Sequence, residues 1–336
     1  MKKFFISLAV FVMAFCANAQ TNQYFWYNGN LMMGNPIAKI DSVTFGEGEP
    51  ADTLHILLPR TIIKEVHDTV YITVHDTVCP NDVPEGALNG LFSVSADKKV
   101  RFSKGNLQYQ ASTDTWRFAE NQYDTLRIMR NTNTIPTHNG WQDLFAWGTG
   151  NNPTLNTIDN QLYSTFVDWG NNIIDGIPGN TFRTLSCEEW IYLFVNRTNA
   201  ASLFGTCTID GRAGVIVFPD NYDISSLSNF NSFYSLGETY NGQEYSTYTP
   251  GKNHFSDNTY SIEEWKIFEN EGAVFLPACI YDDNTLEGMA GAYQSSTSLN
   301  SNWNRFLLIT NGGLNPQGRY NKYDPRSVRL VQDVVE

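Results

Sequence analysis

Side chains of the kind that perform catalysis are sparse after residue 84 of this 336-residue chain. His138 and His254 are the histidines there, and neither stands in a recognisable context with Ser, Cys or a second His. The chain carries no HExxH motif, no P-loop and no GxGxxG placed after a strand. Its many Asp and Glu residues could supply a carboxylate pair for glycoside hydrolysis, but surface solubility explains them better. We therefore predict no catalytic residue, and keep a carboxylate-dependent hydrolase as the enzymatic alternative.

A second set of residues has the chemistry of recognition. Flat aromatic faces beside amide and guanidinium donors suit sugars or peptide surfaces. The alternative, of equal weight for Trp303, is that the ring packs in the core and the Asn residues shape turns. By contrast, Trp116, Trp190 and Trp265 stand at core positions of strands or helices. The predicted ligand-binding residues are Tyr293, Trp303, Asn304, Arg305, Arg319, Tyr320 and Tyr323.

Residue types that bind metal ions occur at two places. His67, His75 and Cys79 belong to an extended segment, which keeps them far apart. The run 282–284 (Asp-Asp-Asn) could offer oxygen ligands, but it reads better as a solvated turn. We predict neither a metal nor a cofactor.

The first nineteen residues have the pattern of a signal peptide. Lys2 and Lys3 precede an apolar run, and the small residues Ala17 and Ala19 form a cleavage site. Lipidation at Cys16 is the alternative, although a small residue is expected where Phe15 stands. We expect an exported protein of the periplasm, the outer-membrane surface or the extracellular space.

Export permits disulfides among the four remaining cysteines, for which three pairings exist. Cys187 follows a helix cap and Cys279 ends an apolar strand, so both also fit small buried residues. The pairing of Cys79 and Cys207 is equally open, and free thiols are slightly favoured.

The acidic balance of the chain limits its partners. Its formal net charge of −13 argues against nucleic acid, which requires clustered Lys and Arg, and against anionic membrane surfaces. No later stretch is long and apolar enough for a transmembrane helix. Neutral or cationic soluble partners remain.

Composition divides the chain into four parts. Residues 1–19 are the leader, 20–48 an N-terminal β segment, 49–84 an extended spacer, and 85–336 the globular domain. The spacer repeats His-Asp-Thr-Val, and its β-branched face needs a partner strand, which another chain could supply. Its Asp-Thr-Val triplets, like the Asp-Ser-Val at residue 41, resemble a bacterial O-glycosylation acceptor pattern or are simply strand-forming sequence.

Short hairpins and two capped helices are expected to position the candidate residues. Hairpins are predicted at 24–33, 92–103 and 107–118 from alternation and turn residues. Ser186–Glu189 and Ser261–Glu264 are capping boxes, each followed by a Trp. Each helix is followed by a Gly-led apolar strand ending in Pro. Two main helices among short antiparallel strands predict an α+β fold.

Three short motifs resemble a known family. The stretch 183–190 (Arg-Thr-Leu-Ser-Cys-Glu-Glu-Trp) resembles the helix start of C-type-lectin-like domains of the bacterial FISUMP type and of formylglycine-generating-enzyme relatives. The stretches 293–297 (Tyr-Gln-Ser-Ser-Thr) and 327–331 (Ser-Val-Arg-Leu-Val) are similar to two later motifs of these domains. Gln294 replaces the family's Trp, and Thr184 and Leu185 replace a Leu-Pro pair.

This resemblance, covering about residues 90–331, implies a C-type-lectin-like domain whose chain ends meet in a small sheet. The enzyme branch depends on two late cysteines, whereas no Cys follows Cys279 here. The calcium-dependent sugar loop of animal lectins is not matched either, because Arg305 stands where a carboxylate belongs. The expected function is a surface binding module for carbohydrate or protein, such as an adhesin. A structural or assembly component of a cell-surface complex is the main alternative.

Overall fold

The computed structural model describes residues 22–27, 30–36, 83–126, 135–223, 230–232, 247–248, 254–281 and 289–334. It divides into two compact units, Met1–Asp82 and Val83–Glu336. In the first unit, β1 (Asn22–Tyr27) pairs antiparallel with β2 (Asn30–Pro36), which confirms the first predicted hairpin. The leader, the His-Asp-Thr-Val repeat, Cys79 and the 282–284 run lie outside the described residues.

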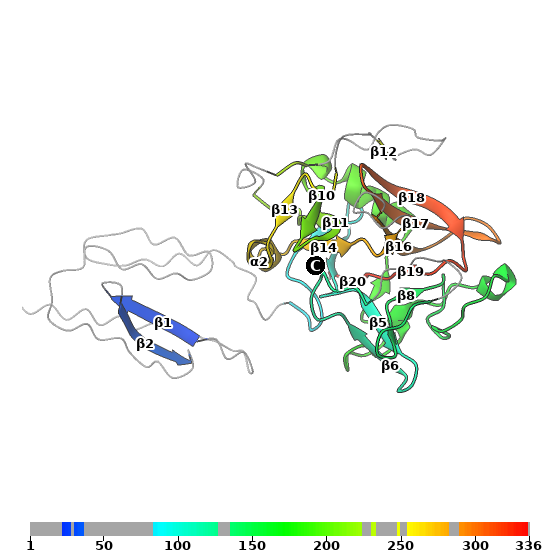
Figure 1. The fold of residues 1–336 in the computed structure, drawn as a ribbon, viewed down its shortest axis with the longest axis horizontal. Helices are drawn as coiled ribbons and strands as arrows, with labels where there is room; N and C mark the ends of the chain where they lie inside the picture. The colour runs from blue at the N-terminus through cyan, green and yellow to red at the C-terminus, as the bar shows by residue number, and fades with distance from the viewer. Residues whose placement is uncertain are drawn as a thin grey trace, which may run out of the picture. The chain divides into compact units, whose positions relative to one another are not determined.

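The two ends of the second unit meet in one small sheet (Figure 1). Its order is β3-β4-β20-β9. The strands are β3 (Phe92–Ser93), β4 (Lys99–Phe102), β9 (Arg183–Thr184) and β20 (Leu330–Asp333). The β3–β4 hairpin was predicted, and pairing of β4 with β20 joins the start of the unit to its end. Arg183 reinforces this closure, since its guanidinium donates to both Glu189 and Asp333.

A second small sheet holds the other predicted hairpin. Its order is β6-β5-β7. The strands are β5 (Leu107–Gln110), β6 (Thr115–Phe118) and β7 (Trp141–Gln142). The inner residues Leu107, Tyr109, Trp116 and Phe118 are buried, as alternation requires for a sheet with one face in the core.

The two Gly-led apolar strands are neighbours in a third sheet, ordered β13-β10-β11-β14. The strands are β10 (Phe204–Ile209), β11 (Arg212–Val217), β13 (Thr259–Tyr260) and β14 (Val274–Pro277). Val215 and Leu276 belong to one buried cluster, whereas Ile216 and Phe275 belong to another. Both faces of this sheet are therefore buried, which explains why these strands are continuous apolar runs.

The longest strands form the largest sheet, with the path β12-β18-β17-β16-β19-β8 and β15 paired to β16. Three long strands follow one another: β16 (Met289–Ser298), β17 (Trp303–Thr310) and β18 (Gly313–Asn321). The short ones are β8 (Leu144–Phe145), β12 (Thr247–Tyr248), β15 (Ile280–Tyr281) and β19 (Arg326–Ser327).

Both predicted capping boxes are present. Ser186 caps α1 (Cys187–Ile191) and Ser261 caps α2 (Ile262–Asn270), and in each helix the third residue is a Glu whose side chain accepts from the backbone N–H of the cap. A π turn, η5 (Tyr192–Asn196), extends α1. Gly272 has a φ of 91° after α2, the left-handed conformation expected of a residue that ends a helix. Single turns of 3-10 helix are η3 (Asn160–Tyr163), η4 (Trp169–Asn171) and η6 (Ala200–Ser202).

The predicted α+β class with two main helices is wrong. Strands account for 37% of the structure and helices for 14%, so it is a β-rich fold of several small sheets. The caps start helices correctly, but α1 has five residues and α2 has nine. Short helices gain little from propagation, so tertiary packing of each Trp holds them in place. Within the described ranges, no helix has the length and apolar character needed to cross a membrane.

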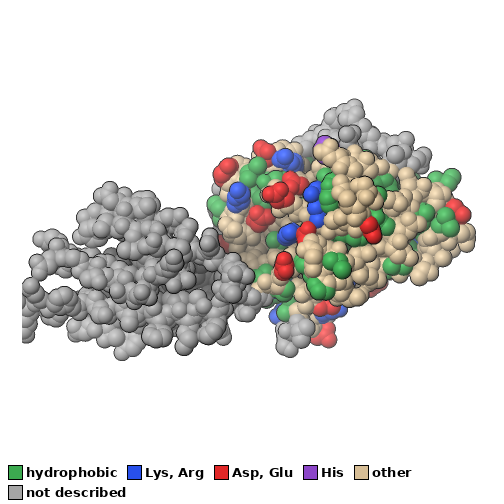
Figure 2. Space-filling model, turned by 90° about the horizontal axis from the view of Figure 1, so that it is seen from below, with side chains coloured by type: hydrophobic (Ala, Val, Ile, Leu, Met, Phe, Trp, Pro, Cys, Tyr) green, Lys and Arg blue, Asp and Glu red, His purple; other side chains and the backbone are tan. Residues whose placement is uncertain are grey.

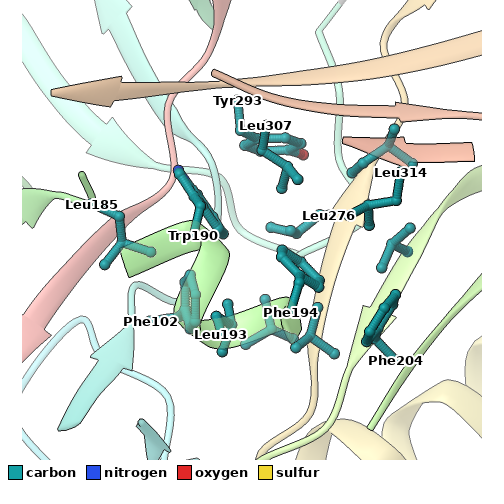
Figure 3. Close-up of a cluster of buried hydrophobic side chains, with 14 of the residues drawn as sticks. Phe102, Leu185, Trp190, Leu193, Phe194, Phe204, Leu276, Tyr293, Leu307 and Leu314 are labelled. Atoms are coloured by element: carbon teal, nitrogen blue, oxygen red, sulfur yellow. The ribbon is translucent and has the colours of Figure 1, made fainter. Parts of the chain in front are cut away.

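The main core lies where α1 meets three sheets. Trp190 is fully buried between Phe102, in β4 of the β3-β4-β20-β9 sheet, and Phe194, with Tyr293 and Leu307 nearby (Figure 3). Trp265 of α2 is also fully buried, but in the separate cluster that contains Phe275. The two helices therefore cover opposite faces of the third sheet. The predicted core positions of Trp116, Trp190 and Trp265 are confirmed.

Candidate functional site

Four predicted residues lie together where β17 begins and β18 ends, at the open end of the β17–β18 hairpin and away from its turn at 311–312. This group adjoins the β16–β17 turn at 299–302 and is here named the hairpin tip: Trp303, Arg305, Arg319 and Tyr320. The register pairs Asn304 with Tyr320 and Arg305 with Arg319. Because side chains alternate along a strand, Trp303, Arg305 and Arg319 share one face and Tyr320 lies on the other. The guanidinium carbon of Arg319 lies 5.7 Å from the centroid of the Trp303 ring, within cation–π range.

The two rings of the hairpin tip are exposed, although aromatic side chains of the rest of the domain are mostly buried. Trp303 is 37% exposed and Tyr320 is 52% exposed. Figure 1 shows the tip, where β18 ends, at the edge of the domain. It therefore presents aromatic surface on both faces of the sheet, where β17 begins and β18 ends.

Hydrogen bonds of the preceding turn hold Trp303 in place. The side-chain oxygen of Asn300 accepts from the backbone N–H groups of Asn302 and Trp303 at 2.9 and 2.8 Å. The Trp303 carbonyl accepts in turn from Leu299 and Asn300. The backbone that carries the ring is thus fixed before any ligand arrives, which lowers the entropy cost of binding.

Arg305 is anchored rather than mobile. Its Nη1 donates to the carbonyl oxygen of Gln317 at 2.8 Å across the hairpin. The two guanidinium groups of the tip give it local positive charge on an acidic chain. On the face drawn in Figure 2, acidic and basic side chains are interspersed.

Tyr293 and Asn304 lie inside the domain and not on the surface. Both are 0% exposed. The Tyr293 hydroxyl donates to the carbonyl of Pro277 at 2.9 Å, and burial raises the pKa of this phenol. Asn304 donates to the side-chain oxygen of Gln294 at 2.8 Å. These two residues position the sheet, and a ligand at the surface does not reach them.

Tyr323 follows the tip in the sequence and packs into the domain. It is half-buried against the cluster of Ala146, Trp147 and Tyr163. Its pKa is raised by desolvation and by the negative charge of Asp324. The chain that follows β18 is therefore anchored in the domain.

A buried cation, Arg326, packs against β17. Arg326 places its guanidinium carbon 4.0 Å from the centroid of the Phe306 ring, and burial lowers its pKa to about 10. It donates to the carbonyl oxygen of Asp324 at 3.0 Å. This arrangement ties the chain after β18 to the underside of β17.

The described cysteines are free, buried thiols. Burial raises the pKa of Cys187 and of Cys279 to about 12 and that of Cys207 still further. A thiol is a nucleophile only as thiolate, so these three are inert at neutral pH. Within the described part of the chain, no group of three or more His, Cys, Asp or Glu side chains could hold a metal ion.

A pocket on the small β6-β5-β7 sheet was not predicted. Arg117 of β6 lies over Trp141 of β7, 3.7 Å from the ring centroid. Trp141 follows an Asn-Gly turn in a long loop without clear periodicity, so nothing placed it beside Arg117. The available signal was that Gln108 and Arg117 alternate with the apolar residues of the predicted hairpin.

Comparison with known proteins adds no assignment. No protein-family model, no curated protein and no solved structure matches this chain.

Proposed function

We propose that this protein is an exported binding module, not an enzyme, and that its hairpin tip contacts a carbohydrate or protein ligand. The observation that carries the proposal is the exposure of Trp303 and Tyr320 on a hairpin that is otherwise packed into the domain. Trp, Tyr and Arg are the residues that most often dominate binding energy at interfaces. The tip combines all three.

The shape of the tip favours an extended ligand. The rings of Trp303 and Tyr320 lie on opposite faces of the sheet. They could therefore enter a groove on a partner protein, or contact successive units of a polysaccharide chain. Arg319 beside Trp303 adds donors at the edge of the apolar surface. Since the whole chain is acidic, these guanidinium groups also direct which part of it approaches a ligand.

The leader and the family resemblance also support an exported binding module. The pattern of residues 1–19 favours export to the periplasm, the outer-membrane surface or the outside of the cell. The motifs at 183–190, 293–297 and 327–331 favour kinship with FISUMP-type domains, which stays a prediction.

An assembly role is the second candidate. The β1–β2 hairpin belongs to a unit of its own and forms a two-stranded sheet. A two-stranded hairpin is marginally stable alone, so pairing with another chain would stabilise it. Deletion of residues 22–36 that abolishes surface assembly, while ligand binding persists, would favour this role.

The test is an array of glycans and extracellular proteins probed with the full-length protein. The double variant Trp303→Ala/Tyr320→Ala should lose the ligands that wild type binds. Ile267→Ala is the matched control, because Ile267 is 60% exposed on α2 and far from the tip in sequence. Equal binding by wild type and the double variant would refute the role of the tip.

A further inference from the structure

A pocket of about 440 Å³ opens on the small β6-β5-β7 sheet. Asp114, Arg117, Trp141, Ile173 and Asp175 contribute to its lining. This volume lies in the range of about 300–1,000 Å³ that holds small ligands. The pocket shares no residue with the hairpin tip.

The guanidinium of Arg117 is fixed in the pocket from two sides. It lies over the Trp141 ring, and its Nε donates to the side-chain oxygen of Gln108 at 2.8 Å. Its two terminal nitrogens have no hydrogen-bond partner among the described residues. They are therefore preorganised donors for a ligand.

Two carboxylates supply the acceptors, and each is held by one of its oxygens. Oδ1 of Asp114 accepts from the Tyr109 hydroxyl at 3.0 Å. Oδ2 of Asp175 accepts from the backbone N–H of Phe118 and forms an ion pair with Lys104 at 2.9 Å. The second oxygen of each carboxylate is left to accept from a ligand.

Apolar surface completes the pocket. Ile173 is 65% exposed, unusual for so large an aliphatic side chain, and Trp141 is partly exposed. The Cβ position of Gly176 meets no atom within 4 Å, so this side of the pocket is open. The C–H face of a ligand can pack against Ile173 while its polar groups reach the charged side chains.

We propose that this pocket binds a neutral saccharide of one or two rings. The two carboxylates are balanced by Arg117 and Lys104, so an ion of either sign would meet a like charge. Hydroxyl groups both donate and accept, and so can satisfy Asp114 and Arg117 together. This proposal is independent of the hairpin tip.

The test follows the indole N–H signals of the full-length protein by two-dimensional NMR. The Trp141 signal is assigned as the one that Trp141→Phe removes. The probes are glucose, galactose, mannose, N-acetylglucosamine, lactose and cellobiose. At least one of them should shift the Trp141 signal saturably, and glucuronate and glucosamine should bind at least about tenfold more weakly.

Two variants connect the shift to the pocket. Arg117→Gln should weaken binding at least about tenfold, and so should Asp114→Asn. Asp114 has a φ of 49°, a conformation that Asn tolerates, so the second variant keeps the turn. Ile267→Ala is the control and should bind the saccharide as wild type does, because Ile267 is exposed on α2 and belongs to neither the pocket nor the hairpin tip.

Three results would overturn the proposal: no probe shifts the Trp141 signal, the charged sugars bind as well as the neutral ones, or both variants retain full affinity. These results leave the hairpin-tip proposal untouched. That proposal fails if the double variant Trp303→Ala/Tyr320→Ala binds the array ligands as wild type does.

Discussion

Asp143 makes the stability of this domain depend on pH. It is 2% exposed, its Oδ2 accepts from the backbone N–H of Leu126 at 2.8 Å, and its Oδ1 has no hydrogen-bond partner among the described residues. Burial raises the pKa of this carboxyl from 3.8 to about 6. The folded state therefore keeps a proton over a pH range where the unfolded chain has lost it.

The difference between the folded and the unfolded pKa of Asp143 sets the sign and the size of the change in the free energy of unfolding. The stabilisation is fully present below the unfolded pKa of 3.8 and is lost as pH rises through about 6. The full loss is about 3 kcal/mol, of which about 2.5 falls between about pH 4 and about pH 7.5. Asp143→Asn retains an oxygen for Leu126 but cannot ionise. Its stability relative to wild type should therefore rise by about 2.5 kcal/mol over this interval.

Urea unfolding at a series of pH values measures this directly. Tryptophan fluorescence reports on the second unit, because every Trp except Trp26 lies after residue 82. Asp210→Asn, which removes an exposed carboxylate, corrects for the change in net charge. A difference between Asp143→Asn and wild type that does not vary with pH, or that falls as pH rises, would refute the reasoning.

Three further changes test the fold. Ser261→Ala removes the cap of α2 and should cost about 1 kcal/mol in urea unfolding, whereas Ser261→Thr should cost little; equal stabilities would count against the capping role. Gly90→Ala should destabilise by about 1–3 kcal/mol, since its Cβ would collide with the carbonyl of Gly272, and a stable variant would show that this approach relaxes freely. In a Cys79→Ser background, Cys187, Cys207 and Cys279 should react with Ellman's reagent only after denaturant is added, and rapid labelling of the native protein would contradict their burial.

Local signals in the sequence were enough to predict the helix starts and several of the hairpins. The capping boxes at Ser186 and Ser261 and the hairpins of β3–β4 and β5–β6 were predicted because each depends on a few adjacent residues. The fold class was not, because helix starts say little about helix length. Strand β16 was also missed, since its small and polar residues resemble a loop.

The candidate site was predicted only in part, because burial of a polar side chain depends on partners that are distant in the sequence. Trp303 and Arg305 do alternate with Asn304 along β17, but a polar Asn at the inward position hides the pattern. Asn304 is buried because it bonds to Gln294 on the neighbouring strand, a partner that periodicity does not reveal. The same applies to the pocket, where Arg117 and Trp141 meet through the pairing of three strands.

The affinity of the hairpin tip for its ligand tests the central claim most directly. Calorimetric titration of the strongest array ligand into wild type, Trp303→Ala and Ile267→Ala should show at least about a tenfold loss of affinity for Trp303→Ala alone. The same dissociation constant for all three proteins would contradict it.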